Sequence, residues 1–207
     1  MTDISIIGSG NMARGIATRA ATAGHQVQIL ARDQKAADAL ATEIGGSAGA
    51  IGDPLRGSIV VLALPYDAVG ETLRQLGGQL NGKTLVDITN PVDYTTFAGL
   101  VVPRDSSAAA EIAKQAPAAS VVKAFNTVFA GTLLSGEVAG NSLDVLLAGD
   151  DEDAKRAFSE FVTSTGLRPI DAGDLSAAHW LEGIGFLHMK IQNGLGTSFN
   201  TAVKIVS

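Results

Sequence analysis

Short apolar runs alternate with stretches of helical periodicity along most of the chain. The apolar runs predict strands at 4–7, 27–30, 58–64, 84–88, 121–125, 143–148 and 167–171. The stretches between them predict helices at 12–23, 35–44, 67–76, 107–116 and 151–164. Strands that are apolar throughout, separated by helices, are typical of a parallel sheet covered on both faces. The pattern therefore predicts an α/β fold of the Rossmann type, doubly wound around a mostly parallel sheet.

The segments outside this alternation are predicted as follows. Gly45, Gly46 and Gly49 indicate a loop, and residues 92–105 show no clear period. From Ser176 the chain is expected to be helical to its end, with interruptions at Gly194 and Gly196. No repeat or linker divides the chain. We therefore expect one domain over residues 1–175, followed by a short helical segment over residues 176–207.

A glycine-rich turn directly follows the first predicted strand. It reads Gly8-Ser9-Gly10-Asn11-Met12-Ala13 and opens the first predicted helix. In such a turn, Gly8 permits the sharp bend, and Gly10 lets the backbone approach a diphosphate at the helix N-terminus. Ala13 and Gly15 are small enough for close packing of the helix on the sheet. A chance glycine turn is the alternative, but the position between a strand and a helix favours a dinucleotide site.

The end of the second predicted strand indicates which dinucleotide binds. Sites for NAD usually place an acidic residue there, to bind the ribose 2′-hydroxyl. This strand instead ends Leu30-Ala31-Arg32-Asp33, and Asp33 lies one position too far along. Arg32 can stack on adenine and bind a 2′-phosphate, and Lys35 adds positive charge. The pattern favours NADP(H), unless Arg32 and Lys35 form only a solvated surface pair.

Composition excludes several other functions. The formal net charge is −6, with 15 basic against 21 acidic residues, and nucleic-acid binding is therefore not expected. The chain has no cysteine, which excludes disulfides and thiol chemistry, and we expect no metal site. The longest apolar run, 59–65, is far shorter than the roughly 20 residues of a membrane helix. Since the N-terminus lacks a basic and apolar leader, we expect a cytoplasmic protein without a membrane partner.

Two longer motifs are more specific than the glycine turn, namely Val122-Lys123-Ala124-Phe125-Asn126-Thr127 and Gly166-Leu167-Arg168-Pro169. With the glycine turn, they resemble the corresponding motifs of one family, the NADP-dependent reductases of the deazaflavin coenzyme F420. The order of the motifs follows the family over nearly the whole chain. The later motifs are also similar to the cytoplasmic reductase domain of the six-transmembrane metalloreductases.

The resemblance implies hydride exchange between NADP(H) and a flavin-like acceptor, such as coenzyme F420 or a flavin. It places the nicotinamide at the loops Leu64-Pro65-Tyr66, Thr89-Asn90-Pro91 and Asn126-Thr127-Val128. The family's serine or threonine before the adenine-site arginine is Ala31 here, which removes one hydrogen bond to the phosphate. The expected cofactor-binding residues are Gly8, Ser9, Gly10, Asn11, Met12, Ala31, Arg32, Lys35, Leu64, Pro65, Tyr66, Asn90, Pro91 and Asn126.

No side chain is an evident catalyst, and two candidates for proton transfer lie near the C-terminus. Transfer of hydride between stacked rings depends on geometry and water exclusion more than on a proton donor. His188 is one candidate, although a packing role is the simpler interpretation. Lys190, followed by Asn193, approximates the lysine motif of hydroxyacid dehydrogenases, which leaves a hydroxyacid or imine reductase as an alternative. A non-catalytic NADPH sensor is a third possibility.

The C-terminal segment is apolar and rich in glycine. Apolar surface of this kind usually has a partner, and the segment is too short to form a second core. We therefore expect it to form a homodimer interface or to complete the acceptor site.

Overall fold

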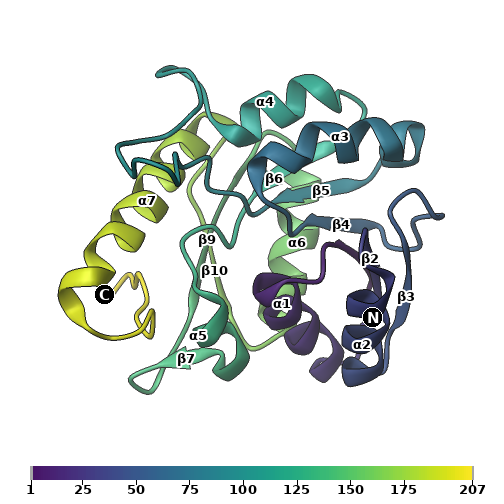
Figure 1. The fold of residues 1–207 in the computed structure, drawn as a ribbon, viewed down its shortest axis with the longest axis horizontal. Coiled ribbons are helices and arrows are strands. Elements are labelled where there is room, and N and C mark those ends of the chain that lie inside the picture. Colours follow the sequence, from purple (N-terminus) through teal and green to yellow (C-terminus); the bar gives the residue numbers. More distant parts are fainter. Residues whose placement is uncertain (1, 207) are drawn as a thin grey trace.

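The computed structural model describes residues 2–206 as an eight-stranded sheet with helices on both faces (Figure 1). The strand order is β10-β9-β6-β5-β4-β1-β2-β3. The strands are β1 (Asp3–Ile7), β2 (Gln26–Ala31), β3 (Ser47–Ala50), β4 (Ile59–Leu62), β5 (Thr84–Asp87), β6 (Ser120–Lys123), β9 (Asp144–Gly149) and β10 (Arg168–Asp171). Strands β1 to β6 pair in parallel, while β9 pairs antiparallel with β6. This order confirms the expected Rossmann-type fold.

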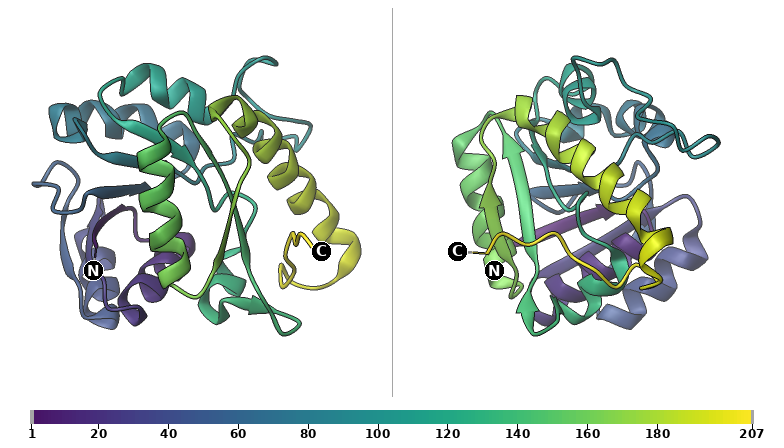
Figure 2. Two further views of the ribbon diagram at one scale, coloured as in Figure 1. Left: turned by 180° about the vertical axis from the view of Figure 1, so that it is seen from behind. Right: turned by 90° about the vertical axis from the view of Figure 1, so that its left-hand side faces the viewer.

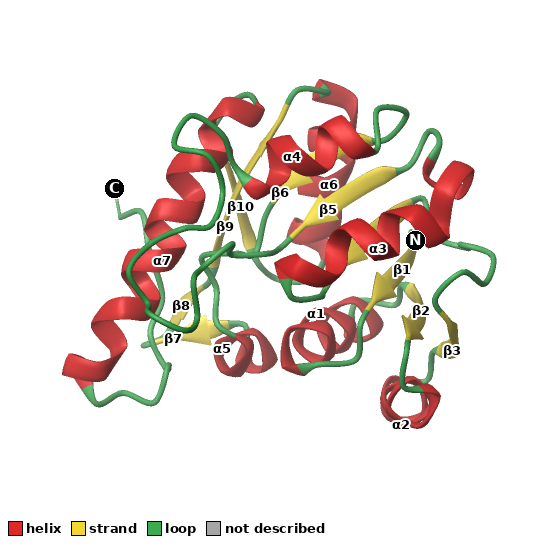
Figure 3. Cartoon of the chain, turned by 45° about the horizontal axis from the view of Figure 1, so that its top comes forward, coloured by secondary structure: helices red, strands yellow, loops and turns green. Residues whose placement is uncertain are grey.

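The helices divide between the two faces of the sheet (Figure 3). On one face lie α1 (Asn11–Thr22), α2 (Gln34–Ile44) and α6 (Glu152–Ser164), whose apolar residues share a core. On the other lie α3 (Tyr66–Leu76) and α4 (Ala108–Gln115), which share a second core. Strand side chains alternate between the two cores, for example Ile6 and Ile7 in β1. Burial on both faces explains why these strands are apolar throughout.

Two predictions from the sequence were wrong: that Gly49 lies in a loop, and that the chain is helical from Ser176 to its end. Gly49 lies within β3, where a side chain would crowd the Asp53 carboxylate. The C-terminal segment forms one helix, α7 (Ala178–Leu195), after the short 3-10 turn Leu175–Ala177. Residues 197–206 have no regular secondary structure and run back toward β9 (Figure 2). Gly196 ends α7 in a left-handed conformation, so the helix does not continue to the C-terminus.

Some short elements have no sequence signal of their own. Helix α5 (Ala130–Ser135) follows β6 and packs against α1, where Gly15 leaves room for Leu133. The hairpin of β7 (Glu137–Val138) and β8 (Asn141–Ser142) follows α5. A 3-10 turn, Gly77–Leu80, extends α3. These elements are too short to show a helical or strand period.

The C-terminal tail, residues 197–206, is attached to the sheet at Asp144, the first residue of β9. The Asp144 carboxylate, whose side chain is fully buried, accepts hydrogen bonds from Arg168 (2.8 and 2.6 Å), Lys204 (2.6 Å) and the Ile205 amide (2.8 Å). Burial by itself raises the pKa of Asp144, but the bonds from Arg168, Lys204 and the amide outweigh it and lower the pKa to about 2. The tail is therefore held by a buried, charged carboxylate.

Candidate functional site

The glycine turn between β1 and α1 has a conformation that only glycine accommodates. Gly8 has a φ of 123°, and a Cβ there would overlap the carbonyl oxygen of Ala63 at the end of β4. The Gly8 amide donates to the carbonyl oxygen of Leu30 in β2 at 2.8 Å. The turn is therefore fixed between two neighbouring strands.

The N-terminus of α1 is open to a ligand. Its N-cap residue is Gly10, and no side chain in the described part of the chain caps it. A Cβ at Gly10 would meet no atom within 4 Å, so the space in front of the helix is free. The uncapped N–H groups and the helix dipole favour an anion at this position. The arrangement fits the diphosphate of a dinucleotide.

A cavity of about 530 Å³ extends from this turn along the carboxyl ends of the parallel strands. Eight of the expected cofactor-binding residues line it, namely Gly10, Asn11, Met12, Leu64, Pro65, Tyr66, Asn90 and Asn126. The remaining lining residues are Ala63, Ile88, Thr89, Tyr94, Phe125, Val128, Phe129, Ala130 and Met189. The cavity thus lies where open α/β sheets usually bind ligands.

A second, more polar groove of about 400 Å³ adjoins the cavity at Leu64 and Pro65, which line both. Arg32 lies on its wall. Asp33 is occupied elsewhere, because its carboxylate caps α2 by accepting from the Ala36 amide at 3.2 Å. The groove therefore has one basic residue that can bind a 2′-phosphate, together with two acidic lining residues, Asp67 and Glu71.

The other expected cofactor residues lie around the cavity and the groove without lining them. Ser9 is half-buried in the turn, Ala31 and Pro91 are buried, and Lys35 is exposed on α2. Lys35 is therefore a surface residue three positions after Arg32, and it lines neither the cavity nor the groove.

Two asparagines hold the cavity wall together. The side-chain Nδ2 group of Asn90 donates to the carbonyl oxygen of Asn126 at 2.8 Å. The Nδ2 group of Asn126 donates to Asn90 Oδ1 at 3.0 Å and to the carbonyl oxygen of Leu181 at 2.8 Å. Phe125 immediately before Asn126 has a φ of 59°, a strained conformation for a bulky residue that sharply redirects the chain there. Gly185 of α7 makes this approach possible, since a Cβ there would lie 2.5 Å from Asn90 Oδ1.

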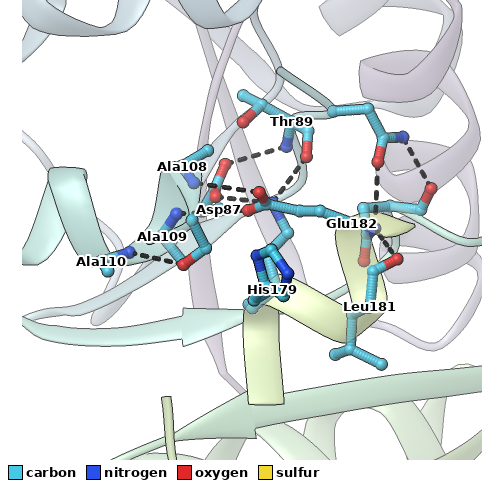
Figure 4. A network of polar contacts seen from close by, with 12 residues as sticks. Asp87, Thr89, Ala108, Ala109, Ala110, His179, Leu181 and Glu182 are labelled. Atoms are coloured by element: carbon cyan, nitrogen blue, oxygen red, sulfur yellow. Dashed lines mark hydrogen bonds and ion pairs between the residues drawn. The ribbon is translucent and has the colours of Figure 1, made fainter. Parts of the chain in front are cut away.

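A buried ion network lies behind this wall (Figure 4). Lys123 Nζ contacts Asp87 Oδ2 at 2.8 Å, Glu182 Oε1 at 2.8 Å and the carbonyl oxygen of Thr89 at 2.6 Å. All three ionisable side chains are fully buried. Glu182 also accepts from the Ala108 amide at 3.0 Å, at the N-terminus of α4. The network joins the ends of β5 and β6 to α4 and α7.

The charge balance of this network depends on the end of α4. Two carboxylates face one ammonium group, so one negative charge has no counter-ion among these three side chains. Burial raises the pKa of Glu182, although Lys123 and the Ala108 amide act in the opposite direction. The positive end of the α4 dipole lies at Glu182 and offsets part of the free-energy cost of burying a charged carboxylate there.

The two proton-transfer candidates lie outside the cavity. His188 is buried, stacks on Phe129 with ring centroids 4.2 Å apart, and contacts the carbonyl oxygen of Thr127 at 3.2 Å and Thr201 Oγ1 at 2.8 Å. Burial lowers the pKa of His188, which favours the neutral ring. Lys190 is exposed, with Nζ 5.5 Å from the centroid of the Phe186 ring. Neither side chain faces the cavity wall as a lining residue.

The cavity contains little titratable chemistry. Among its lining residues, only Tyr66 and Tyr94 ionise, and both carry hydroxyl groups. Burial raises the pKa of both above the usual value, and at Tyr66 the carboxylates of Glu111, Glu182 and Asp87 raise it further. Both tyrosines are therefore protonated at neutral pH. The cavity is suited to a reaction that needs stacking and exclusion of water more than an acid–base pair.

Sequence reasoning missed several residues of this site. Tyr94 comes from the aperiodic 92–105 segment, and Phe129 and Met189 contribute apolar walls from elements whose packing no local pattern shows. Lys123 had a signal, since a lysine inside an apolar strand must be paired when it is buried. Its partners, however, lie 36 and 59 positions away.

Comparison with known proteins places this site in a family. The family model described as "NADP oxidoreductase coenzyme F420-dependent" matches residues 3–91. The F420-dependent NADP reductase of Methanothermobacter thermautotrophicus is 31% identical over 210 residues, covering 92% of this chain and 90% of that protein. The chain belongs to the F420-dependent NADP oxidoreductase family. This confirms the resemblance in the sequence and, with it, the class of NADP-dependent oxidoreductases.

Two further proteins are also similar to this chain. A solved structure of a putative F420-dependent NADP-reductase from Arthrobacter sp. FB24 superposes with a TM-score of 0.90, at 29% identity over the full length of both chains. Metalloreductase STEAP3 of Rattus norvegicus is 33% identical over 184 residues, covering 87% of this chain. The chain spans 36% of the length of that metalloreductase.

More distant structures share only the fold. An imine reductase from Aspergillus terreus, solved in complex with NADPH4, superposes with a TM-score of 0.70 at 21% identity. The match covers 95% of this chain and 63% of that one. In the described residues, 2–206, no helix is long and apolar enough to cross a membrane.

Proposed function

We propose that this protein transfers a hydride between NADP(H) and a planar, flavin-like acceptor, either a deazaflavin such as coenzyme F420 or a flavin. The observation that carries the proposal is the mainly apolar cavity that begins at the uncapped N-terminus of α1 and has no charged lining residue. Such a cavity can hold two stacked rings and exclude water, which is what ring-to-ring hydride transfer requires.

The proposed cofactor pose follows the order of the polar groups. The N–H groups at the start of α1 bind the diphosphate, and Arg32 binds the 2′-phosphate in the adjoining groove. The nicotinamide, which supplies the hydride, lies in the cavity near Asn90 and Asn126. Residues 1–175 form the dinucleotide-binding unit, and residues 176–207 complete the acceptor side through Met189.

Two alternatives are less well supported by these residues. A hydroxyacid or imine reductase that uses Lys190 needs this amine at the substrate, but Lys190 is exposed and lies over Phe186. A sensor without turnover does not require a cavity larger than its cofactor. The cavity of about 530 Å³ is distinct from the groove at Arg32, and in the proposed pose it holds the nicotinamide and a second ring while the groove holds the 2′-phosphate.

An acceptor screen tests the proposed reaction. The purified protein is incubated with NADPH and, separately, with coenzyme F420, FMN, riboflavin, a quinone, and a set of small carbonyl and imine compounds. We expect sustained oxidation of NADPH, followed as loss of the absorbance of the reduced nicotinamide, with a deazaflavin or flavin. Turnover confined to the carbonyl or imine compounds, or binding of NADPH without turnover of any acceptor, would contradict the proposal.

We also propose that the protein is a homodimer formed through α7. Five apolar side chains are exposed along this helix, namely Trp180 (71%), Ile184 (36%), Leu187 (59%), Ile191 (46%) and Leu195 (53%). Their spacing of four, three, four and four residues forms one continuous stripe that is typical of a helix packed on another helix. The helix is about 27 Å long at 1.5 Å per residue.

A second copy is the partner that fits this stripe. The stripe itself contains no charged residue, so two copies meet there without repulsion, although each carries a formal charge of −6. Pairing of identical patches around a twofold axis also closes the assembly. Light scattering should give twice the chain mass of 21.1 kDa. Leu187→Glu should give a monomer, while Leu134→Glu, at an exposed leucine of α5, should leave the dimer intact. A monomeric unmodified protein at micromolar concentration would overturn this assignment.

A further inference from the structure

The groove beside the cavity brings together side chains of opposite charge. Arg32 is the one basic residue among its lining residues, and two carboxylates, Asp67 and Glu71, line it as well. All three side chains are exposed, so a ligand in the groove can reach each of them. An anionic group bound there therefore meets one positive and two negative side chains.

The two acids lie on the groove because of their spacing along α3. Asp67, Glu71 and Gln75 follow one another at intervals of four residues, which places them on one face of the helix, and all three line the groove. Helix α3 follows β4, whereas Arg32 follows β2, and β1 lies between these two strands. The carboxylates therefore come from the β4 side of the groove and the guanidinium from the β2 side.

Little in the protein offsets these negative charges. Glu71 pairs with Arg74 at 2.5 Å, but the two side chains are 62% and 71% exposed, and such a pair is weak in water. None of the ion pairs in the described part of the chain involves Asp67 or Arg32. The dipole of α3 favours an acid in its first turn, which suits Asp67 but does not apply to Glu71, one turn later.

The acids should affect NADPH and NADH differently, because these dinucleotides differ only at the 2′-position of one ribose. NADPH has a phosphate there with close to two negative charges, and NADH has a hydroxyl. A carboxylate about 7 Å from a phosphate dianion in water weakens binding about fourfold at low salt and about twofold at 0.15 M salt. A hydroxyl has no net charge and can donate a hydrogen bond to a carboxylate.

We propose that Asp67 and Glu71 counteract Arg32, so that the groove accepts the 2′-hydroxyl of NADH as well as the 2′-phosphate of NADPH. Arg32 favours NADPH, and the two carboxylates remove most of this advantage. The protein should therefore prefer NADPH over NADH by about tenfold or less at low salt. This inference rests on the proposed binding of the 2′-phosphate at Arg32.

Neutral variants of the two acids test the proposal through a gain of affinity, which a damaged fold cannot produce. Calorimetric titrations are made with NADPH and with NADH at an ionic strength of about 0.02 M, where the Debye length is about 20 Å. Asp67→Asn should tighten NADPH binding about fourfold, and the double variant Asp67→Asn, Glu71→Gln about tenfold. Binding of NADH should change by less than about twofold.

Two smaller ligands restrict the effect to the groove. Adenosine 2′,5′-bisphosphate and adenosine 5′-monophosphate differ only by the 2′-phosphate and contain no nicotinamide. The first should bind Asp67→Asn about fourfold more tightly than the unmodified protein, and the second should bind both equally. At 0.15 M salt the gain should fall to about twofold.

An ion pair on the other face of the sheet provides the matched control. Asp153 and Arg156 on α6 are three residues apart, pair at 2.5 Å and are exposed, as are Glu71 and Arg74. Asp153→Asn removes the same formal charge from the protein but none from the groove. It should change the affinity for NADPH by less than about 1.5-fold.

The possible outcomes separate this inference from the proposed function. Unchanged NADPH binding by Asp67→Asn and the double variant, or an equal gain for NADPH and NADH, would overturn the role of the acids while leaving the cofactor site intact. An equal gain in Asp153→Asn, or a preference of the unmodified protein for NADPH above about 100-fold, would also overturn it. If Arg32→Ala left the ratio of NADPH to NADH affinity unchanged, the proposed 2′-phosphate site itself would be wrong.

Discussion

Alanine substitutions at Gly183 and Gly185 of α7 should have opposite effects, because two positions along a helix lie on opposite faces. A Cβ at Gly183 would meet no atom within 4 Å. A Cβ at Gly185 would lie 2.5 Å from Asn90 Oδ1, 2.8 Å from the carbonyl oxygen of Asn126 and 3.0 Å from Asn126 Nδ2. The second methyl group therefore intrudes on the asparagine pair that holds the cavity wall.

The magnitude follows from three contributions. Replacing glycine by alanine inside a helix stabilises it by about 1 kcal/mol at either position. At Gly185, the clash includes a backbone atom that cannot rotate away, and such overpacking costs about 1–3 kcal/mol. Displacement of Asn90 and Asn126 weakens two hydrogen bonds, each contributing about 1 kcal/mol. We expect Gly185→Ala to destabilise the fold by about 2 kcal/mol and Gly183→Ala to stabilise it by up to about 1 kcal/mol.

Thermal unfolding and cofactor titration together measure this difference. For a chain of this size, Gly185→Ala should lower the Tm by about 4–8 °C, and Gly183→Ala should raise it by about 2–4 °C. Gly185→Ala should also weaken NADPH binding by about tenfold, because the cavity wall at the proposed nicotinamide site moves. If Gly185→Ala were as stable as Gly183→Ala and bound NADPH normally, the close contact between α7 and the asparagine pair would not exist as described.

Three further predictions concern charged groups. Arg32→Ala should weaken NADPH binding by about 10- to 100-fold and NADH binding much less, as measured by calorimetry. Arg56→Ala, near the amino ends of β1, β2 and β3, should change neither. The pKa of Asp144 is about 2 in the folded protein against an ordinary value of 3.8. Its carboxylate therefore stabilises the fold by about 2 kcal/mol above pH 4, and this stabilisation is lost as the pH falls from about 4 to 2. The stability difference between the unmodified protein and Asp144→Asn in urea titrations should therefore disappear by about pH 2 and be fully present at pH 6. Lys123→Met should destabilise by about 3–5 kcal/mol, because it leaves two buried carboxylates unpaired, whereas Lys114→Met at an exposed ion pair should cost less than about 1 kcal/mol in the same titration.

Much of the sheet could be predicted because its signals are local. The strands are apolar on both faces, and the glycine turn at Gly8 and Gly10 follows the first of them. The strand type, the order of the elements along the chain and the turn were therefore all visible in the sequence. Gly49 shows where this reasoning fails. It lies in β3, where it pairs with Leu30 of β2 and where the Asp53 carboxylate leaves no room for a side chain, whereas the glycine pattern alone indicated a loop.

The site is only partly encoded in such local patterns. Eight of the expected cofactor residues meet in one cavity, because the carboxyl ends of parallel strands converge at one edge of the sheet. His188 and Lys190 were candidates because of their residue types, but helical packing places one behind Phe129 and the other on the surface. Which way a side chain on α7 points depends on what the helix packs against.

The sequence by itself therefore determined the Rossmann-type sheet, the glycine turn and the family, since period-two and helical patterns and short motifs depend on neighbouring residues. Only the tertiary structure decided the buried network around Lys123, the placement of Asp67 and Glu71 in one groove with Arg32, and the exposed apolar stripe of α7. These features arise from contacts between residues tens of positions apart, such as Asp87 with Lys123 and Leu181 with Asn126. Burial and hydrogen-bond pairing become defined only when distant segments have packed together.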